Sequence, residues 1–402
     1  MLNNDAAVAV VKCDDYDVGL IKSAILSMAE MTSVEKIDFT SKKITLKLNL
    51  VMKKSPELAA TTHPAVVESV ILWLTERGVN PCDITIADSF GGPYTEGTMR
   101  TIYRACGIEE VALRLGVTLN YDMSYVGVSS PEANMLKAFN VITPVTDADI
   151  IINLCKLKSH ALTGLSCAVK NFFGIIPGVE KFETHARFPD LNDFSDALND
   201  IALWVHTKIP TVISICDAVV GMEGNGPTSG HPRKIGALLM SENSFLLDVA
   251  AAHILNLGET VKTLSFAEKR GLIPSGGISS LTLRGDDIDE LVITDFRRPD
   301  SNYNNFFTKF PNMFGGKLVS FFEPKPVINA TKCLGCGECV TSCPVHTISL
   351  RVADKGNGNG NKKHTRTVKI NYEQCIKCFC CQELCPHGAV KIRKNPFLKM
   401  LI

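Results

Sequence analysis

Two short cysteine runs near the C-terminus place the strongest constraint on this 402-residue chain. Both runs have the spacing C-x2-C-x2-C-x3-C, and a proline follows each of them, Pro344 and Pro386. The eight cysteines are Cys333, Cys336, Cys339 and Cys343, then Cys375, Cys378, Cys381 and Cys385. Such a repeat is typical of bacterial two-cluster iron–sulfur modules, in which three thiolates of one run share a cluster with the fourth thiolate of the other.

The crossed pattern predicts two [4Fe–4S] clusters. We expect the first cluster to be held by Cys333, Cys336, Cys339 and Cys385, and the second by Cys375, Cys378, Cys381 and Cys343. Zinc is the alternative metal, but a zinc site needs only four ligands and does not require a crossed, proline-terminated repeat. Cys380 breaks the regular spacing, so we expect it to lie outside both ligand sets.

The rest of the chain alternates short β-branched runs with amphipathic segments. The predicted strands are Val8–Val11, Ile44–Leu50, Ile84–Ala87, Ile150–Leu154 and Val212–Ile215. The predicted helices include Val18–Met31, one from Pro64 to Gly78, and one capped by Asn192 or Asp193. This alternation predicts an α/β domain over residues 1–297, with a mainly parallel sheet flanked by helices.

The C-terminal quarter differs in composition from the α/β domain. Residues 298–325 are rich in phenylalanine and asparagine and are expected to connect two domains. Residues 326–402 are expected to form a ferredoxin-like α+β domain that holds both clusters. Within it, predicted strands Ser349–Val352 and Thr367–Ile370 flank a glycine- and asparagine-rich tip at Lys355–Lys363.

Charge and cysteine usage limit the classes of partner and compartment. Basic and acidic residues balance at 42 each, which argues against a nucleic-acid partner and against binding to an anionic membrane. No apolar run reaches the length of a membrane span, and no signal peptide is visible at the start. The remaining cysteines lack the spacing of a disulfide scaffold, so a cytoplasmic location is expected.

One polar constellation in the α/β domain indicates a pocket for an anion. Lys156, Lys158 and His160 alternate along the chain, so in an extended segment they share one face. Ser166 and Lys170 are four residues apart and are expected to share a helix face. The remaining members are Asn171, Lys181 and His185. Carboxylate or phosphate is the expected guest, and a solvated charged face is the alternative.

Acidic residues and glycines lie near two of the predicted strand ends, where parallel sheets collect ligands. Asp88 follows Ile84–Ala87, and is either a proton-transfer group, a metal ligand or the cap of a helix near Glu96. Asp217 follows the last predicted strand. Glu223, Gly224 and Gly226 come next, in a turn that either donates backbone N–H groups to a ligand or is purely structural. Lys47 and Asn49 are candidates for the same crevice.

These motifs together resemble a known family. The segments that carry the resemblance are Lys156–His160, Ala168–Gly174, Asp217–Ala218 and Met222–Pro227. They are similar to the family of the domain of unknown function 362, whose members are often fused to a C-terminal two-cluster ferredoxin. The resemblance covers roughly residues 5–295 and the cysteine-rich tail. It implies an iron–sulfur protein typical of anaerobes and supplies no reaction.

The chain departs from the family pattern at two positions. Leu48 stands where the family usually has proline. Asn243 stands where an aspartate is common, which leaves Asp248 as the nearby acid.

The sequence supports an oxidoreductase that passes electrons from its clusters to an anionic small molecule. The candidate catalytic residues are His160, Lys170, Asp217, Glu223 and Asp88. The candidate ligand-binding residues are Lys156, Lys158, Asn171, Gly224 and Gly226. The alternative is an electron-transfer or assembly protein that docks a redox partner and performs no chemistry itself. A third interpretation is a non-redox enzyme whose clusters are only structural.

Overall fold

A nine-stranded mixed sheet forms the centre of the α/β domain. The computed structural model describes residues 2–301, 324–356 and 362–393. The strand order is β11-β1-β10-β9-β7-β2-β3-β4, and β8 pairs with β7 beside this path. The strands of this sheet are β1 (Val8–Lys12), β2 (Ile44–Lys47), β3 (Ile84–Ala87), β4 (Thr118–Leu119), β7 (Ile150–His160), β8 (Gly164–Ser166), β9 (Thr211–Glu223), β10 (His231–Ser241) and β11 (Leu283–Gly285).

The middle of the sheet is parallel, as the sequence predicts. From β4 through β3, β2 and β7 to β9, each strand is parallel to its neighbour. β11 is parallel to β1, whereas β10 runs antiparallel to both β1 and β9, and β8 is antiparallel to β7. The carboxyl ends of β2, β3 and β7 therefore lie along one edge, which is where the polar motifs gather.

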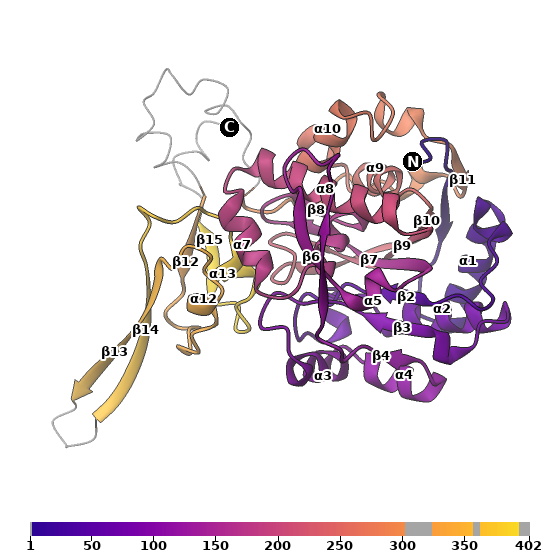
Figure 1. Ribbon diagram of the computed structural model, residues 1–402. Coiled ribbons are helices and arrows are strands. Elements are labelled where there is room, and N and C mark those ends of the chain that lie inside the picture. The colour runs from indigo at the N-terminus through magenta and orange to yellow at the C-terminus, as the bar shows by residue number, and fades with distance from the viewer. Residues whose placement is uncertain (1, 302–323, 357–361, 394–402) are drawn as a thin grey trace.

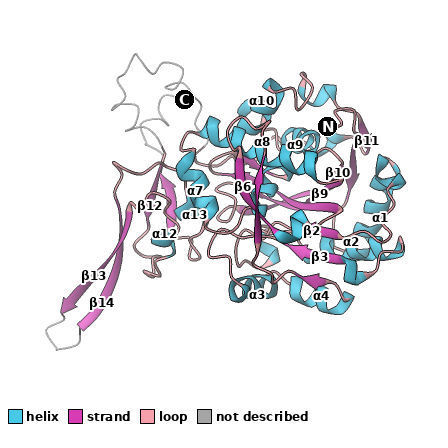
Figure 2. Ribbon diagram, in the orientation of Figure 1, coloured by secondary structure: helices cyan, strands magenta, loops and turns pink. Residues whose placement is uncertain are grey.

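Helices cover both faces of the sheet (Figures 1 and 2). One face packs against α1 (Val18–Glu30), α2 (Pro64–Glu76), α3 (Glu96–Ala105) and α4 (Ile108–Leu115). The other packs against α6 (Ala168–Asn171), α8 (Leu191–Lys208), α9 (Ser244–Ile254) and α10 (Lys262–Lys269). The remaining elements of this domain include α5 (Thr143–Thr146), α7 (Glu180–Arg187) and a separate antiparallel pair, β5 (Tyr125–Ser129) with β6 (Ala138–Ile142).

Strand β7 shows why the core has two halves. Its side chains alternate between the faces, so Ile151 and Leu157 join the core under α8 and α9 while Ile152 and Leu154 join the core under α1 and α2. The predicted strand ends at Leu154, whereas β7 continues to His160. All of its residues are buried.

Several predicted boundaries are corrected by the structure. Strand β2 ends at Lys47 and not at Leu50, and β9 runs on to Glu223, so Asp217 lies within a strand. Helix α8 is capped by Asp190, whose carboxylate accepts from Asn192 N at 2.7 Å.

The predicted helix through Ser166 and Lys170 is also wrong. Ser166 ends strand β8, and the short helix α6 begins only at Ala168. The cap of α3 is Thr95, so Asp88 does not have that role.

The second unit, which we call the cysteine module, comprises the described residues 324–356 and 362–393. In it, β12 (Lys325–Ile328) pairs with β15 (Val390–Arg393), and β13 (Ile348–Gly356) pairs with β14 (Lys362–Ile370). The short helices α12 (Glu338–Thr341) and α13 (Cys380–Glu383) follow the two cysteine loops. Figure 1 shows the β13–β14 ladder reaching away from the rest of the molecule. Most of the predicted connector at 298–325, and positions 357–361 of the predicted tip, lie outside the described residues, so the domain boundaries stay a prediction.

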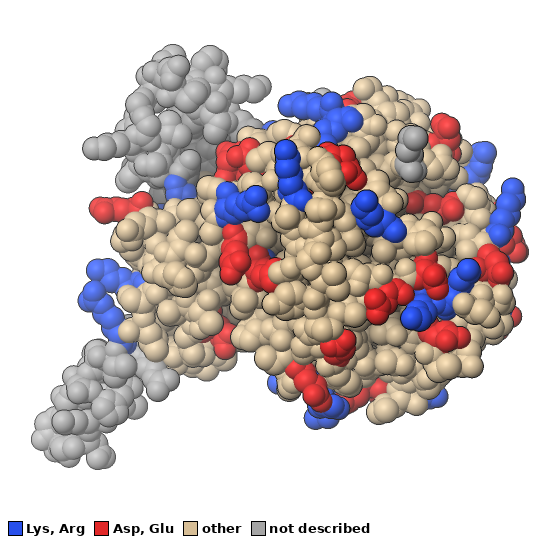
Figure 3. All heavy atoms as spheres, viewed as in Figure 1, with Lys and Arg blue, Asp and Glu red and all other residues tan. Residues whose placement is uncertain are grey.

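The surface mixes charges of both signs. Figure 3 shows lysine and arginine interspersed with aspartate and glutamate on the face viewed there. Across the described ranges, every helix falls short of the length and apolarity needed to cross a bilayer.

Candidate functional site

A cavity of about 80 Å³ lies where the cysteine module meets the α/β domain. The α/β domain supplies the basic side chains Lys158, His160, Lys170, Lys181 and His185 to its wall. The cysteine module supplies Cys380, Glu383 and Leu384. The cavity therefore exists only because the two units are docked.

Apolar contacts and one turn hold the two units together. Ala161, just after β7, is buried against Phe379 and Ile392 of the cysteine module. The turn after β9 binds α13 directly: Thr228 Oγ1 donates to the Glu383 carbonyl at 2.5 Å, and Gln382 Nε2 donates to the Asn225 carbonyl at 3.1 Å. Of the two alternatives for this turn, the contacts of the described residues favour the structural one.

Lys170 is the cavity lysine whose Nζ is left without a hydrogen bond or ion pair by the described part of the chain. Among the described residues its Nζ makes no hydrogen bond or ion pair, and its ring contact is with Phe173, 5.3 Å from Nζ to the ring centroid. Burial lowers the pKa of Lys170, while Glu383 and Cys380 act in the opposite direction. A poorly solvated ammonium without a counter-charge is costly, so an anion in the cavity would stabilise it.

The other two lysines of the cavity are already bonded. Lys158 Nζ donates to Asn49 Oδ1 at 2.5 Å and to the Ala60 carbonyl at 2.7 Å. Burial, then Lys170 and Lys156, lower the pKa of Lys158 to about 7. Lys181 Nζ lies 2.7 Å from both the Ser89 and the Ile176 carbonyls, and burial lowers its pKa to about 7. The Lys158 and Lys181 side chains are therefore near the midpoint of their titration at neutral pH. These partner oxygens are uncharged carbonyl and amide oxygens.

His160 faces Glu383 across the domain junction. His160 Nδ1 accepts the N–H groups of Leu162 at 3.1 Å and Thr163 at 3.3 Å, which leaves the proton of the neutral ring on Nε2. Nε2 lies 3.2 Å from Glu383 Oε1, but the pair is out of line for a hydrogen bond, so both buried atoms lack one among the described residues.

His160 is a candidate catalytic residue from the sequence, but burial gives a proton-exchanging role to Glu383 instead. Burial, then Lys170, His185 and Lys158, lower the pKa of His160 well below its ordinary value. The imidazole therefore stays neutral and does not exchange protons near pH 7. Burial raises the pKa of Glu383 to about 7, although Lys170 and Lys158 oppose this. Glu383, which the sequence analysis missed, thus joins Lys158 and Lys181 as a cavity group suited to proton exchange near neutral pH.

Asp88 lines the cavity but is fully engaged. Its Oδ1 lies 2.7 Å from Lys47 Nζ, and both side chains of this ion pair are buried. Its other oxygen accepts from Leu50 N at 2.5 Å, and Ser89 N donates to Oδ1 at 2.8 Å. A Cβ on Gly174 would lie 2.3 Å from Asp88 Oδ1, so only glycine lets this segment pass over the pair.

Lys156 and Asp217 do not line the cavity. Lys156 Nζ lies 2.8 Å from Asp217 Oδ2 and 2.7 Å from Tyr16 Oη. Tyr16 Oη donates to Asp217 Oδ1 at 2.9 Å, and His63 N donates to Oδ2 at 3.0 Å. This closed network ties β7 and β9 to the start of α2, so its geometry favours a structural role.

Of the remaining predicted site residues, three make structural contacts and one lines the cavity. Glu223 accepts the backbone N–H of Arg297 at 3.2 Å, outside the cavity. The Gly224 carbonyl accepts from Ser159 Oγ at 2.8 Å, and the Gly226 carbonyl accepts from Ala161 N at 3.0 Å, so both glycines anchor the end of β7. Asn171 does line the cavity. Its side chain accepts from Asn49 Nδ2 at 2.8 Å and donates to Asn153 Oδ1 at 2.7 Å.

Cysteines of the two runs come together within the module. One small cavity is lined by the complete first set, Cys333, Cys336, Cys339 and Cys385. Burial, then the thiols of Cys385, Cys336 and Cys333, raise the pKa of Cys339 to about 11. In the second set, burial and then Cys378 and Cys343 raise the pKa of Cys375. Four thiols converging from two loops are the donor set that a [4Fe–4S] cluster requires.

Cys380 lies between the second cysteine set and the cavity. It is buried, lines the cavity, and forms a side-chain hydrogen bond with Cys378 that lowers the pKa of that thiol. The ligand sets expected from the spacing need neither its sulfur nor its position, and its exclusion from them stays a prediction. Its place in the cavity wall was not predicted.

Comparisons with known proteins agree with this architecture. The family model described as domain of unknown function (DUF362) matches residues 44–253, and a 4Fe-4S dicluster domain matches residues 332–389. The thylakoid-associated protein sll1697 of Synechocystis sp. is 29% identical over 299 residues, which is 73% of this chain and 88% of that protein. NADH-quinone oxidoreductase subunit I of Pelobacter propionicus is 33% identical over 64 residues, 16% of this chain and 34% of that subunit.

Solved structures give only distant matches. A Thermotoga maritima protein is 15% identical with a TM-score of 0.37, over 64% of this chain and 60% of that one. The lactate racemase apoprotein of Thermoanaerobacterium thermosaccharolyticum is 13% identical with a TM-score of 0.36, over 61% of this chain and 57% of that one. The chain thus spans less than two thirds of either structure, and these likenesses say nothing about its reaction.

The family model covers more than half of the chain, and the dicluster model covers both cysteine runs. The protein is therefore an iron–sulfur electron-transfer protein that belongs to the family of the domain of unknown function DUF362.

Proposed function

We propose that the protein is an oxidoreductase that transfers electrons between two [4Fe–4S] clusters and a small anion bound in the junction cavity. One observation carries the proposal: the segment 378–384 supplies two thiols of the second cysteine set and three residues of the cavity wall. A molecule in the cavity would thus lie against the loop that holds a cluster.

The size and charge of the cavity define the class of substrate. A volume of about 80 Å³ has room for roughly five to eight water-sized groups, so the substrate is a carboxylate or phosphate of few atoms. Lys170 is the group available to bind it, and a charge-assisted hydrogen bond contributes ~1.5–3 kcal/mol. Nε2–H of His160 is a second donor that the protein leaves unused.

The chain's own residues also supply a route for a proton. A [4Fe–4S] cluster on Cys343, Cys375, Cys378 and Cys381 supplies single electrons when bound. Glu383, with its pKa raised to about 7, holds or releases a proton beside the substrate. His160 stays neutral and orients the substrate by donating from Nε2.

One member of the first cysteine set suits exchange with a redox partner protein. Cys336 is exposed, and the neighbouring Leu334 is 69% exposed. Electrons would enter or leave there. The cysteine usage supports a reducing, cytoplasmic setting such as that of an anaerobe.

One observation favours a second function. The cavity is small against the ~300–1,000 Å³ of ordinary ligand pockets. An electron-transfer or assembly protein without chemistry of its own would need only an anion that stabilises the docked module.

Anaerobic purification of the full chain separates the two functions. Mass spectrometry of the denatured protein should find one small anion in the wild type. Lys170→Ala should retain at least about tenfold less of it, at ~1.4 kcal/mol per tenfold. Lys269→Ala is the matched control, because Lys269 is exposed and contacts a ring in the same way, 5.0 Å above Phe266.

The released anion is then added to protein whose clusters have been reduced. Reoxidation of the clusters supports the oxidoreductase. Retention of the anion without reoxidation supports the partner protein, and an empty cavity in the wild type contradicts both.

A further inference from the structure

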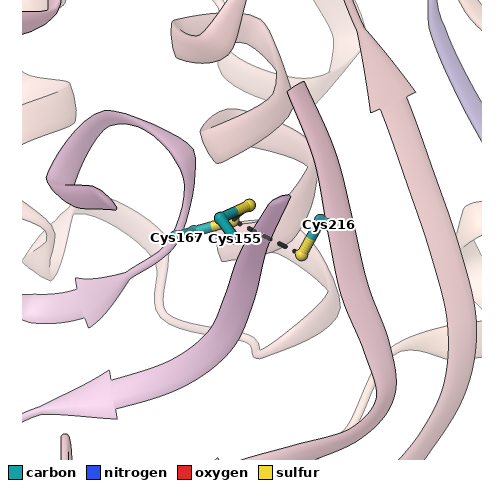
Figure 4. Close-up of side chains that lie close together, drawn as sticks. All are labelled: Cys155, Cys167 and Cys216. Atoms are coloured by element: carbon teal, nitrogen blue, oxygen red, sulfur yellow. Dashed lines mark hydrogen bonds between the residues drawn. The ribbon is translucent and has the colours of Figure 1, made fainter. Parts of the chain in front are cut away.

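Three cysteines outside the cysteine module meet in the core of the α/β domain (Figure 4). Cys155 lies on β7, Cys216 lies on β9, and Cys167 immediately precedes α6. All three are buried, and none forms a disulfide. Their sulfur atoms lie within 4.8 Å of one another.

The spacing of the sulfurs is that of a metal site. Cys155 Sγ lies 3.7 Å from Cys167 Sγ, which in turn lies 3.5 Å from Cys216 Sγ. Tetrahedral zinc with Zn–S bonds of about 2.3 Å holds its sulfurs roughly 3.8 Å apart. Only small shifts would bring the three thiols to that arrangement.

A buried carboxylate lies next to one of the three sulfurs, that of Cys167. Asp248 on α9 is buried and interacts with Cys167, and it is close enough to Cys216 for their charges to interact. Its carboxylate oxygens also accept from Ala168 N at 2.6 Å and Val169 N at 3.2 Å, which fixes their orientation. A ligating carboxylate is commonly held by such outer hydrogen bonds.

We propose that the core holds one structural Zn²⁺ ion, whose four ligands are Cys155, Cys167, Cys216 and Asp248. The set is closed, because four protein ligands leave no position for water or substrate. It joins β7 and β9 to the starts of α6 and α9. It also positions the cavity, because α6 carries Lys170 and Asn171, while Lys158 follows on β7. The proposal is independent of the reaction assigned to the cavity.

The competing explanation is packing. Free cysteine behaves as a small apolar side chain, and all three belong to the core cluster under α8 and α9. Packing alone does not require three sulfurs from three segments to meet within 4.8 Å of one another.

Metal analysis of the full, iron-loaded chain tests the site. After exposure to a chelator, the anaerobically purified protein should keep about one zinc per chain. Cys155→Ala, Cys167→Ala and Cys216→Ala should each lose the zinc while the iron content stays unchanged. Cys106→Ala, at a buried cysteine in the other half of the core, should keep both metals.

X-ray absorption at the zinc edge decides the case even if a variant fails to fold. The wild type should show three sulfurs at about 2.3 Å and one lighter ligand. Wild-type protein with no zinc overturns the proposal. So does zinc bound by four sulfurs, which would mean that zinc has replaced iron in the cysteine module.

Discussion

Glu383 Oε1 of the cysteine module lies 3.2 Å from His160 Nε2 at the end of strand β7. The two residues are 223 positions apart in the sequence, so only the docking of the two units brings them together. A carboxyl group that titrates near neutrality thereby faces an imidazole that stays neutral. The cavity between the units has its proton donor on one side and its anion-binding lysine on the other.

The affinity for the anion should rise as the pH falls through about 7. Below that pH Lys158 and Lys181 each gain a positive charge, and Glu383 loses a negative one, since the pKa of each is near 7. Above pH 7, each linked proton should weaken binding by up to about tenfold per pH unit, so three protons give at most about a thousandfold. Titration calorimetry with the co-purified anion at several pH values measures this slope. A pH-independent affinity would contradict it.

Glu383→Gln should lower that slope by about a third, because glutamine keeps the shape of the side chain and cannot ionise. The Glu383→Gln substitution should also change how the free energy of unfolding depends on pH between about 4.5 and 7. The pKa of Glu383 is raised in the folded protein, so its contribution to the free energy of unfolding is full below about pH 4.5 and is lost as the pH rises towards 7. The variant should lack this loss in chemical denaturation. Glu373→Gln, exposed in the same module, should behave as the wild type.

Lys170→Ala should weaken anion binding by about ten- to a hundredfold while the melting temperature of the anion-free protein stays nearly unchanged. The reason is that Nζ has no hydrogen bond or ion pair to lose within the described chain. Calorimetry gives the affinity and differential scanning fluorimetry the stability. A large drop in melting temperature would show that Lys170 holds the junction together instead.

Lys156→Ala should lower the stability of the protein and leave anion binding intact. It leaves Asp217 buried without its counter-charge, which costs about 3–5 kcal/mol of the free energy of unfolding. Lys234→Ala breaks an exposed ion pair with Asp14 and should cost roughly 0–1 kcal/mol in the same urea titration. Folded Lys156→Ala protein should still retain the anion, because Lys156 does not line the cavity.

Cys381→Ser should reduce the iron content from about eight to about four per chain, whereas Cys380→Ser should leave it unchanged. Cys381 is buried beside Cys378 and Cys375, while Cys380 forms part of the cavity wall. Iron and sulfide assays with low-temperature spectroscopy distinguish the variants. The reverse result would place the ligand register one residue earlier.

Local signals in the sequence explain which parts of the fold could be predicted. Strand Ile84–Ala87 is found as predicted, because apolar residues alternate there and polar residues bound the run. The end of β7 was missed, because Lys156 and Lys158 suggest a surface strand. Their burial depends on acceptors supplied by Asp217 and Asn49, which lie far away in the sequence.

The candidate site was predictable only in part for the same reason. The basic residues Lys158, His160 and Lys170 were identified from their spacing, and the structure brings them to one cavity. Glu383 was missed because it lies inside a cysteine run, where nothing in the local pattern indicates a partner in the other domain. The raised pKa of its carboxyl comes from burial on docking, which sequence periodicity does not encode.

The turn at Asn225–Thr228 is hydrogen-bonded to α13, and α13 begins inside the second cysteine run. Cluster loading would fix the geometry of that run, so we expect the last wall of the cavity to form only when the metal is inserted. Newly made protein would therefore be unable to hold the proposed ligand until cluster assembly is finished. Under the proposed function, cluster assembly would then control when the chain first binds its substrate.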